Sequence, residues 1–342
     1  MAHETHPLSP RQVLLILGAA TLLVAFGALM VGGAAIPPQE VVRQCWQSLC
    51  GHAPDDATGR IILTTRLPRI ILAIAVGAGM GLAGLAAQTL FRNPLASPYV
   101  MGVSSGAAVG AVFGMLLAGK VIGFAAVPLF SVASGLVVTA AVFLLARRGG
   151  HFGQSLLLAG IAVSAFCSAL TAAALYLAGE RLQTLVFWLM GGLWQATWRD
   201  ELVMAPATAA CFTALVFLAP AMDVALVGER SARDLGVNVR RLQNGLLILV
   251  AVTTSVAISL TGVIGFVGLI VPHLLRMAMG AGHRSLVPAC AIGGALLLLV
   301  ADTLARTVAA PAEVPVGILT ALVGAPVFLW LLQRRGVGRP AA

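Results

Sequence analysis

Long uncharged apolar runs alternate with short charged segments along nearly the whole chain. The first six runs, each of 19 to 26 residues, are 13–31, 70–90, 98–119, 121–146, 155–179 and 202–222. A helix needs about 20 mostly apolar residues to cross a bilayer. The pattern therefore predicts six membrane-spanning helices in the first two thirds of the chain.

The next uncharged stretch is too long for a single span. Between Arg241 and Arg276 lie 34 residues without a formal charge. As one helix they would be about 51 Å long, against a hydrocarbon core of about 30 Å. The Thr-Gly-Val-Ile-Gly segment at residues 261–265 offers a break. The last four expected spans are therefore 242–260, 264–279, 286–308 and 314–332.

Composition supports this interpretation and excludes most soluble classes. Hydrophobic residues make up 59% of the 342 positions and charged residues 10%, whereas soluble domains average about 45–50% and about 25%. The residues outside the spans form short connections with no room for a sizeable soluble domain. We expect an all-α integral membrane protein with ten transmembrane helices, forming a single permease domain over residues 1–342.

The net charge of +9 reports orientation in the membrane. Its 21 basic residues separate the apolar runs instead of clustering on one face, so no nucleic-acid partner is expected. With both termini in the cytoplasm, thirteen basic residues lie inside and eight outside. That balance agrees with the excess of Lys and Arg in cytoplasmic loops.

Two outer connections carry recognisable patterns. Residues 39–49 are amphipathic and predict a short surface helix, and residues 180–201 hold aromatic side chains typical of the membrane–water interface. The second segment is either a short helix at the outer mouth or only an aromatic belt. Cys45 and Cys50 could form a disulfide in an oxidising compartment, although a helix holds positions five apart poorly for bridging.

The sequence holds no complete ATP-binding or catalytic motif. Residues 114–121 match a phosphate-binding loop up to the last position, where Val121 replaces the required Ser or Thr. The six His residues show no metal-ligand spacing. Asp302 and Arg306 are four residues apart on one expected helix and can form an ion pair. Because the pair neutralises itself, these two residues do not suggest a proton relay. We expect no catalytic residue, no metal site and no cofactor bound by this chain.

A membrane protein without its own motor needs a surface for a cytoplasmic one. The segment 226–241 mixes both signs of charge and predicts a short helix ended by Gly236. It is either such a coupling surface or a solvated connector.

Several stretches resemble one known family. They are Arg-Leu-Pro-Arg at 66–69, Gln-Thr-Leu-Phe-Arg-Asn-Pro-Leu-Ala at 88–96, Gly-Val-Ile-Gly-Phe-Val-Gly-Leu-Ile-Val-Pro-His at 262–273, Asp-Thr-Leu-Ala-Arg at 302–306 and Pro-Val-Gly-Ile-Leu-Thr at 315–320. Together they resemble the FecCD family of ABC-importer permeases over about residues 60–332.

The resemblance implies a type II importer permease in the bacterial inner membrane. It implies a second permease copy in a homodimer with the pathway at the interface, two cytoplasmic ATPase subunits that bind ATP and Mg, and one periplasmic substrate-binding protein. The implied substrate is an iron-containing chelate or cobalamin. Haem is slightly favoured over a ferric siderophore, because Arg181 at the outer mouth can meet carboxylates unless it is only a rim arginine. The alternative is an ion-coupled secondary transporter acting alone.

The resemblance also implies roles for three sets of residues. The binding protein would dock on Arg66, Arg69 and Arg306, the last partly held by Asp302. The ATPase would couple to Glu229, Arg230, Ala232, Arg233, Leu235 and Gly236. The cytoplasmic gate would lie at Asn93, Leu95, Phe152 and Gly153.

Overall fold

The computed structural model describes residues 9–32, 35–51, 56–118, 123–147, 152–280 and 282–336. Within these ranges every regular element is a helix. Gly119, Lys120 and Val121, which end the apparent phosphate-binding loop, lie outside them.

Seven helical segments in the described ranges are long and apolar enough to cross a membrane. They contain α1 (Pro10–Met30), α4 (Leu67–Phe91), α7 (Ala126–Arg147), α8 (Phe152–Tyr176), α10 (Trp198–Val227), α12 (Val239–Thr261) and α14 (His283–Thr307). Three shorter apolar helices contain α5 (Val103–Phe113), α13 (Val267–Met279) and α15 (Val316–Gly336). The expected all-α membrane fold of ten helices is confirmed.

The second span is longer than the uncharged run that predicts it. Helix α3 (Ala57–Arg60), a π-helical turn η1 (Ile61–Arg66) and α4 follow one another in a helical run of 35 residues. The helix therefore continues through Arg60 and Arg66, which the charge pattern assigns to the outer connection. Charge marks where a span is expected to leave the lipid, and helical hydrogen bonding continues beyond it.

The glycines at 261–265 separate two helices as expected. Helix α12 is closed by Gly262, whose φ is 69°, and α13 starts at Val267 after Phe266 with a φ of 66°. An added Cβ on Gly262 would overlap the carbonyl of Trp188. This position therefore needs glycine both for its left-handed backbone and for the close approach of another segment.

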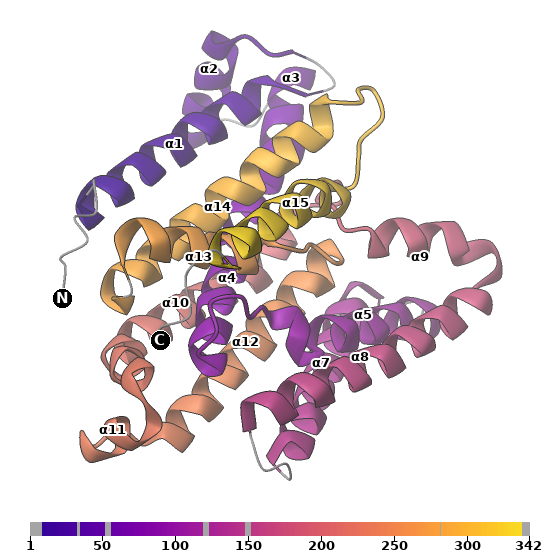
Figure 1. Cartoon of the computed structure of the whole chain (residues 1–342). Helices are drawn as coiled ribbons and strands as arrows, with labels where there is room; N and C mark the ends of the chain where they lie inside the picture. The colour runs from indigo at the N-terminus through magenta and orange to yellow at the C-terminus, as the bar shows by residue number, and fades with distance from the viewer. Residues whose placement is uncertain are drawn as a thin grey trace.

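Helix α4 forms the centre of the bundle. It packs against α10, α12, α13 and α14, while α5, α7 and α8 form a second group that α12 joins to the first (Figure 1). Glycines permit the closest contacts: a Cβ on Gly77 would overlap the carbonyl of Gly294, and one on Gly84 the carbonyl of Gly268. Small residues at such crossings let helix backbones approach in a membrane.

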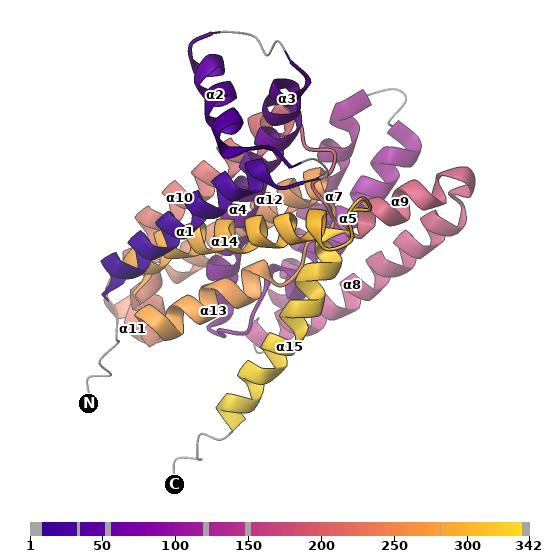
Figure 2. The ribbon, with the colours of Figure 1, turned by 90° about the horizontal axis from the view of Figure 1, so that it is seen from above.

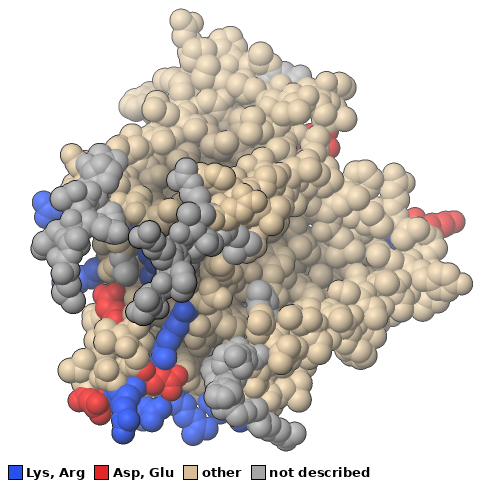
Figure 3. All heavy atoms as spheres, viewed as in Figure 1, with Lys and Arg blue, Asp and Glu red and all other residues tan. Residues whose placement is uncertain are grey.

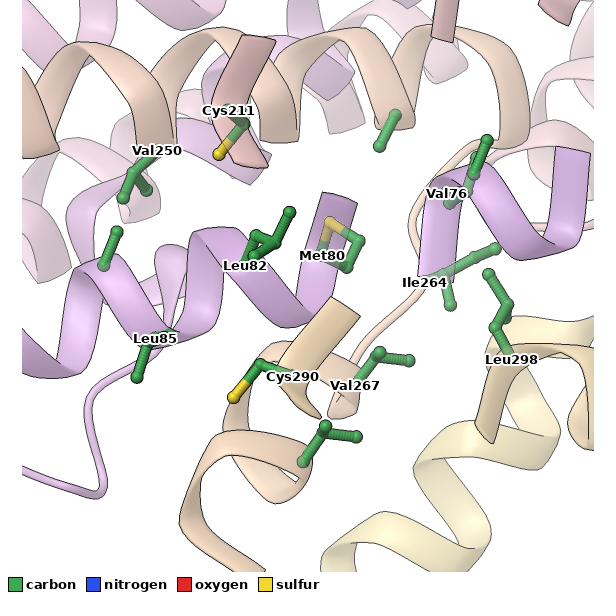
Figure 4. Close-up of a cluster of buried hydrophobic side chains, with 14 of the residues drawn as sticks. Val76, Met80, Leu82, Leu85, Cys211, Val250, Ile264, Val267, Cys290 and Leu298 are labelled. Carbon is green, nitrogen blue, oxygen red and sulfur yellow. The ribbon is translucent and has the colours of Figure 1, made fainter. Parts of the chain in front are cut away.

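Apolar side chains fill the remaining space around α4. Figure 4 shows Met80, Leu82 and Leu85 of α4 among Cys211 of α10 and Cys290 of α14, all of them buried. The outside of the bundle is apolar as well, because leucines of α1 are exposed. Such a surface suits lipid rather than water.

The peripheral elements lie at two ends of the bundle. Helix α1 lies along α14, with α2 (Pro38–Leu49) and α3 projecting beyond them (Figure 2). The short helix α11 (Glu229–Asp234) lies at a different corner (Figure 1). Helix α2 matches the amphipathic pattern, and α9 (Leu182–Leu189) forms within the aromatic segment. We call the two regions the α2 end and the α11 end.

Candidate functional site

Five charged side chains gather at the α2 end, and we call them the arginine cluster: Arg66, Arg69, Arg306, Asp302 and Glu313. Arg69, in the first turn of α4, is its hub. Its Nε and Nη2 lie 3.0 and 2.9 Å from Asp302 Oδ1, and its Nη1 donates to Glu313 Oε2 at 2.8 Å. Such bidentate, charge-assisted contacts are among the stronger hydrogen bonds in proteins.

The pair that the sequence predicts within α14 is present but secondary. Arg306 Nε lies 3.4 Å from Asp302 Oδ2, and its Nη2 donates to the carbonyl of Ala28 at 3.2 Å. Asp302 accepts its hydrogen bonds from Arg69, a residue 233 positions away. Spacing of four residues identifies the neighbour on the same helix, whereas the stronger partner comes from the packing of α4 against α14.

The three arginines are buried rather than offered to solvent. Arg66 donates through Nη1 to the carbonyl of Leu29 at 2.5 Å, so Arg66 and Arg306 both tie the end of α1 to the cluster. Asp302 is fully buried, whereas the Glu313 side chain is 39% exposed. Both carboxylates are engaged within the cluster, Asp302 by Arg69 and Arg306 and Glu313 by Arg69.

Arg181 lies outside this cluster, at the end of η5 (Gly179–Arg181) and directly before α9. It is exposed, and its Nη1 donates to the carbonyls of Met115 and Leu116 at 3.3 and 3.4 Å. A cavity of about 290 Å³ next to Met115 is lined by polar and aromatic side chains from α9 and the segment after it: Gln183, Thr184, Phe187, Trp188, Trp194 and Gln195. The aromatic segment therefore forms a wall of a cavity.

A second cavity has a hydroxyl-rich wall. It measures about 350 Å³, and five of the residues that line it carry hydroxyl groups: Tyr99, Ser104, Ser105, Ser168 and Thr171. They come from η2 (Pro98–Met101), α5 and α8. Sequence reasoning missed this set, since single Ser and Thr residues in apolar helices also bond their own backbone and carry little signal.

At the α11 end lie the six residues that are expected to couple to an ATPase, three of them charged. Ala232 is buried and fixes α11 against the bundle, while Arg230, Arg233 and Leu235 are exposed and Gly236, with a φ of 80°, ends the helix. Figure 3 shows charged side chains gathered at this corner of a face that is otherwise largely uncharged.

A groove of about 700 Å³ lies next to α11. Its charged lining residues are Arg147, Glu229, Arg233 and Arg240. Glu229 is an acceptor for three donors, since Arg92 Nη2, Arg233 Nη2 and Gln243 Nε2 each lie 3.2 Å from its carboxylate. The groove is therefore basic, with its carboxylate already engaged.

The two expected gate segments belong to different elements, one directly after α4 and the other at the start of α8. Arg92 ends α4 with a φ of 48°, and Asn93, which is exposed, accepts a hydrogen bond from the amide of Leu95 at 3.0 Å. Phe152 and Gly153 begin α8. The 3-10 turn η2, which follows the first segment, packs against α8.

One polar chain at this end was missed from the sequence; His283 and Thr89 are buried in it, whereas the Asp223 side chain is 41% exposed. His283 Nδ1 lies 2.6 Å from Asp223 Oδ1, and its Nε2 lies 2.8 Å from Thr89 Oγ1. His283 is entirely buried. A lone histidine between two apolar runs gives no sign in the sequence that α4, α10 and α14 meet there.

The remaining chemical groups are sparse. The part of the chain that the structure describes holds no cluster of three or more His, Cys, Asp or Glu residues that could bind a metal. Cys45 and Cys50 are both free thiols. Burial raises the pKa of the Cys45 thiol, whereas Cys50 is exposed.

Comparisons with known proteins cover nearly the whole chain. The model of the FecCD transport family matches residues 20–334. The hemin transport system permease protein HmuU of Yersinia pestis is 40% identical over 335 residues, which is 95% of this chain and 96% of that protein. The cobalamin import system permease protein BtuC of Halobacterium salinarum is 42% identical over 278 residues, 81% of this chain and 74% of that protein.

A solved structure has the same fold. It is described as a metal-chelate type ABC transporter in an inward-facing conformation. It superposes with a TM-score of 0.83 at 31% identity, covering 95% of this chain and 99% of that one.

Proposed function

Because this chain belongs to the FecCD transport family of ABC-importer permeases, we propose that it carries an iron chelate into the cytoplasm, with haem favoured over a ferric siderophore or cobalamin. The observation that carries the proposal is the match over almost the full length of both this chain and a hemin permease. A multi-pass membrane subunit of this kind moves substrate, and hydrolysis of ATP is assigned to a partner.

The preference for haem rests on Arg181 and on the aromatic side chains beside it. Arg181 is exposed next to an aromatic-lined cavity, where a guanidinium can pair with a propionate and aromatic rings can stack on a planar ligand. The hydroxyl-lined cavity between α5 and α8 adds donors and acceptors without fixed charge. We assign both surfaces to the substrate pathway.

The partners follow from surfaces that this chain leaves open. We assign the contact with a second permease copy to α8 and α15, on which Phe166 and Leu322 are exposed. The charged corner at α11, from Glu229 to Gly236, suits two cytoplasmic ATPase subunits, one for each copy. The gate is assigned to Asn93, Leu95, Phe152 and Gly153. Both chain termini then lie in the cytoplasm.

A periplasmic binding protein would dock through carboxylates on the arginine cluster. Arg69 is already engaged by Glu313, so an incoming carboxylate has to replace Glu313 to reach it. Docking by this route is an exchange of one carboxylate for another, which favours fast release after delivery. Changing Arg66 and Arg69 to Glu should weaken capture of the binding protein, and unchanged capture at low salt would contradict the assignment.

Reconstitution tests the function directly. The complex with its ATPase and binding protein, in liposomes loaded with ATP, should import hemin and should stop when vanadate is added. Ferric siderophore and cobalamin, each with its own loaded binding protein, serve as matched substrates. Uptake that needs no ATP and collapses with a protonophore would instead establish the ion-coupled carrier.

A further inference from the structure

The last turn of α4 is held by two separate polar contacts. Thr89 and Arg92 lie three residues apart, on neighbouring positions of one helix face. The expected gate segment, which begins at Asn93, follows directly. Whatever fixes this turn therefore also fixes the start of the gate segment.

The first contact joins this turn to α11. Arg92 Nη2 lies 3.2 Å from Glu229 Oε1, and the two side chains are 35% and 40% exposed. Glu229 is the first residue of α11, and Arg233 of the same helix contacts its other oxygen. A displacement of α11 therefore acts on Arg92 through a single carboxylate.

The second contact runs through the interior. Asp223, in the last two turns of α10, contacts His283 at 2.6 Å, and His283 contacts Thr89 at 2.8 Å. Asp223 also accepts from the backbone amide of His283 at 2.9 Å. The chain is short and His283, its middle member, is entirely buried. A buried hydrogen-bonded chain of this kind is rigid, so a displacement of Asp223 also displaces Thr89.

These contacts converge at the C-terminal end of α4. Along most of its length α4 is held by glycine-mediated contacts with α13 and α14. Its last residue, Phe91, is followed by Arg92 in a left-handed conformation, and the expected gate segment leaves the helix there. Both carboxylates, Asp223 and Glu229, belong to the α10–α11 region that would receive the ATPase.

We propose that Arg92 and His283 are positioning residues that couple α11 to the cytoplasmic gate. Arg92 transmits the movement of α11 through Glu229, and His283 transmits that of the end of α10 through Thr89. The proposal rests on the importer function proposed above. It adds a route by which a conformational change in the ATPase is transmitted to Asn93 and Leu95.

The test measures substrate imported per ATP hydrolysed by the reconstituted complex. Arg92→Gln and Thr89→Val each remove one contact. Each variant should leave ATP hydrolysis running while import per ATP falls at least about fivefold, the lower range of coupling between sites. Arg92→Lys keeps a positive charge beside Glu229 and should retain most of the import that Arg92→Gln loses. A purely structural role would lower protein yield and both activities together.

Matched controls isolate the two contacts. Glu40→Gln breaks the exposed Glu40–Arg43 pair on α2, and Thr303→Val removes a hydroxyl that bonds the backbone of its own helix. Both should import like the unmodified complex. Unchanged import per ATP in both Arg92→Gln and Thr89→Val would overturn the proposal, as would an equal loss of import in Arg92→Lys and Arg92→Gln. If the unmodified complex shows no ATP-driven import, the importer function fails instead.

Discussion

At the scale of single residues, Asp302 holds the charges of the α2 end together. It is fully buried between Arg69 and Arg306, and both lie within 3.4 Å of its carboxylate. Removing one partner of a buried ion pair costs more than the pair itself contributes, because the remaining charge stays desolvated.

Asp302→Asn keeps the shape of the side chain and removes its charge. We expect the unfolding free energy to fall by about 3–5 kcal/mol, measured as loss of thermal stability of the purified protein in detergent. Glu313→Gln, which also removes a partner of Arg69, should cost much less because Glu313 is 39% exposed. Equal losses from the two changes would show that burial does not set the cost.

Glu313→Gln has a second expected effect on docking. Without its resident carboxylate Arg69 is open to an incoming one, so the Kd for the binding protein should fall by up to about fivefold, the value of a partly exposed ion pair. Titration of labelled binding protein against the permease at low salt measures it. The control Glu180→Gln changes the same charge at an exposed position away from the cluster and should leave the Kd unchanged.

At the scale of helices, the apolar pattern predicts most of the fold. Ten runs correspond to ten apolar helical segments, and the glycines at 261–265 separate α12 from α13. The extension of the second span back to Ala57 could not be predicted, because η1 continues the helix through charged positions. Hydropathy reports contact with lipid, whereas the helix end is set by capping and packing.

Glycines on α4 give a sharp test of how the helices pack. Gly84→Ala places a methyl group against the carbonyl of Gly268, and overpacking of this kind should lower the unfolding free energy by about 1–3 kcal/mol. Gly18→Ala on α1, where an added Cβ has no neighbour within 4 Å, should leave it unchanged or raise it by up to about 1 kcal/mol. Thermal unfolding of both variants in one detergent makes the comparison.

At the scale of the whole molecule, sequence reasoning located both charged ends but not the contacts within them. The motifs at 66–69 and 302–306 point to Arg66, Arg69 and Arg306, yet nothing in them indicates that Glu313 joins the cluster. The Asp223–His283–Thr89 chain was missed for the same reason. Contacts between residues far apart in sequence depend on how ten helices pack, which periodicity along one helix does not encode.

Orientation is a property of the whole chain, and two cysteines report it. In variants that retain only Cys50 or only Cys45, a membrane-impermeant maleimide added to spheroplasts should label both, Cys50 faster. Burial raises the pKa of Cys45, so less of it is thiolate near neutral pH and its labelling should gain more as the pH rises. Labelling that requires permeabilised cells would place α2 in the cytoplasm and invert the proposed orientation.

The arginine cluster also has a consequence for how the chain is made. It joins Ala28 and Leu29 near the start of the chain to Arg69, and closes only with Asp302 and Glu313 near the end. During synthesis Arg69 therefore has neither of these carboxylate partners until the last helices have been made. A chain truncated before residue 302 would therefore leave Arg69 without either carboxylate.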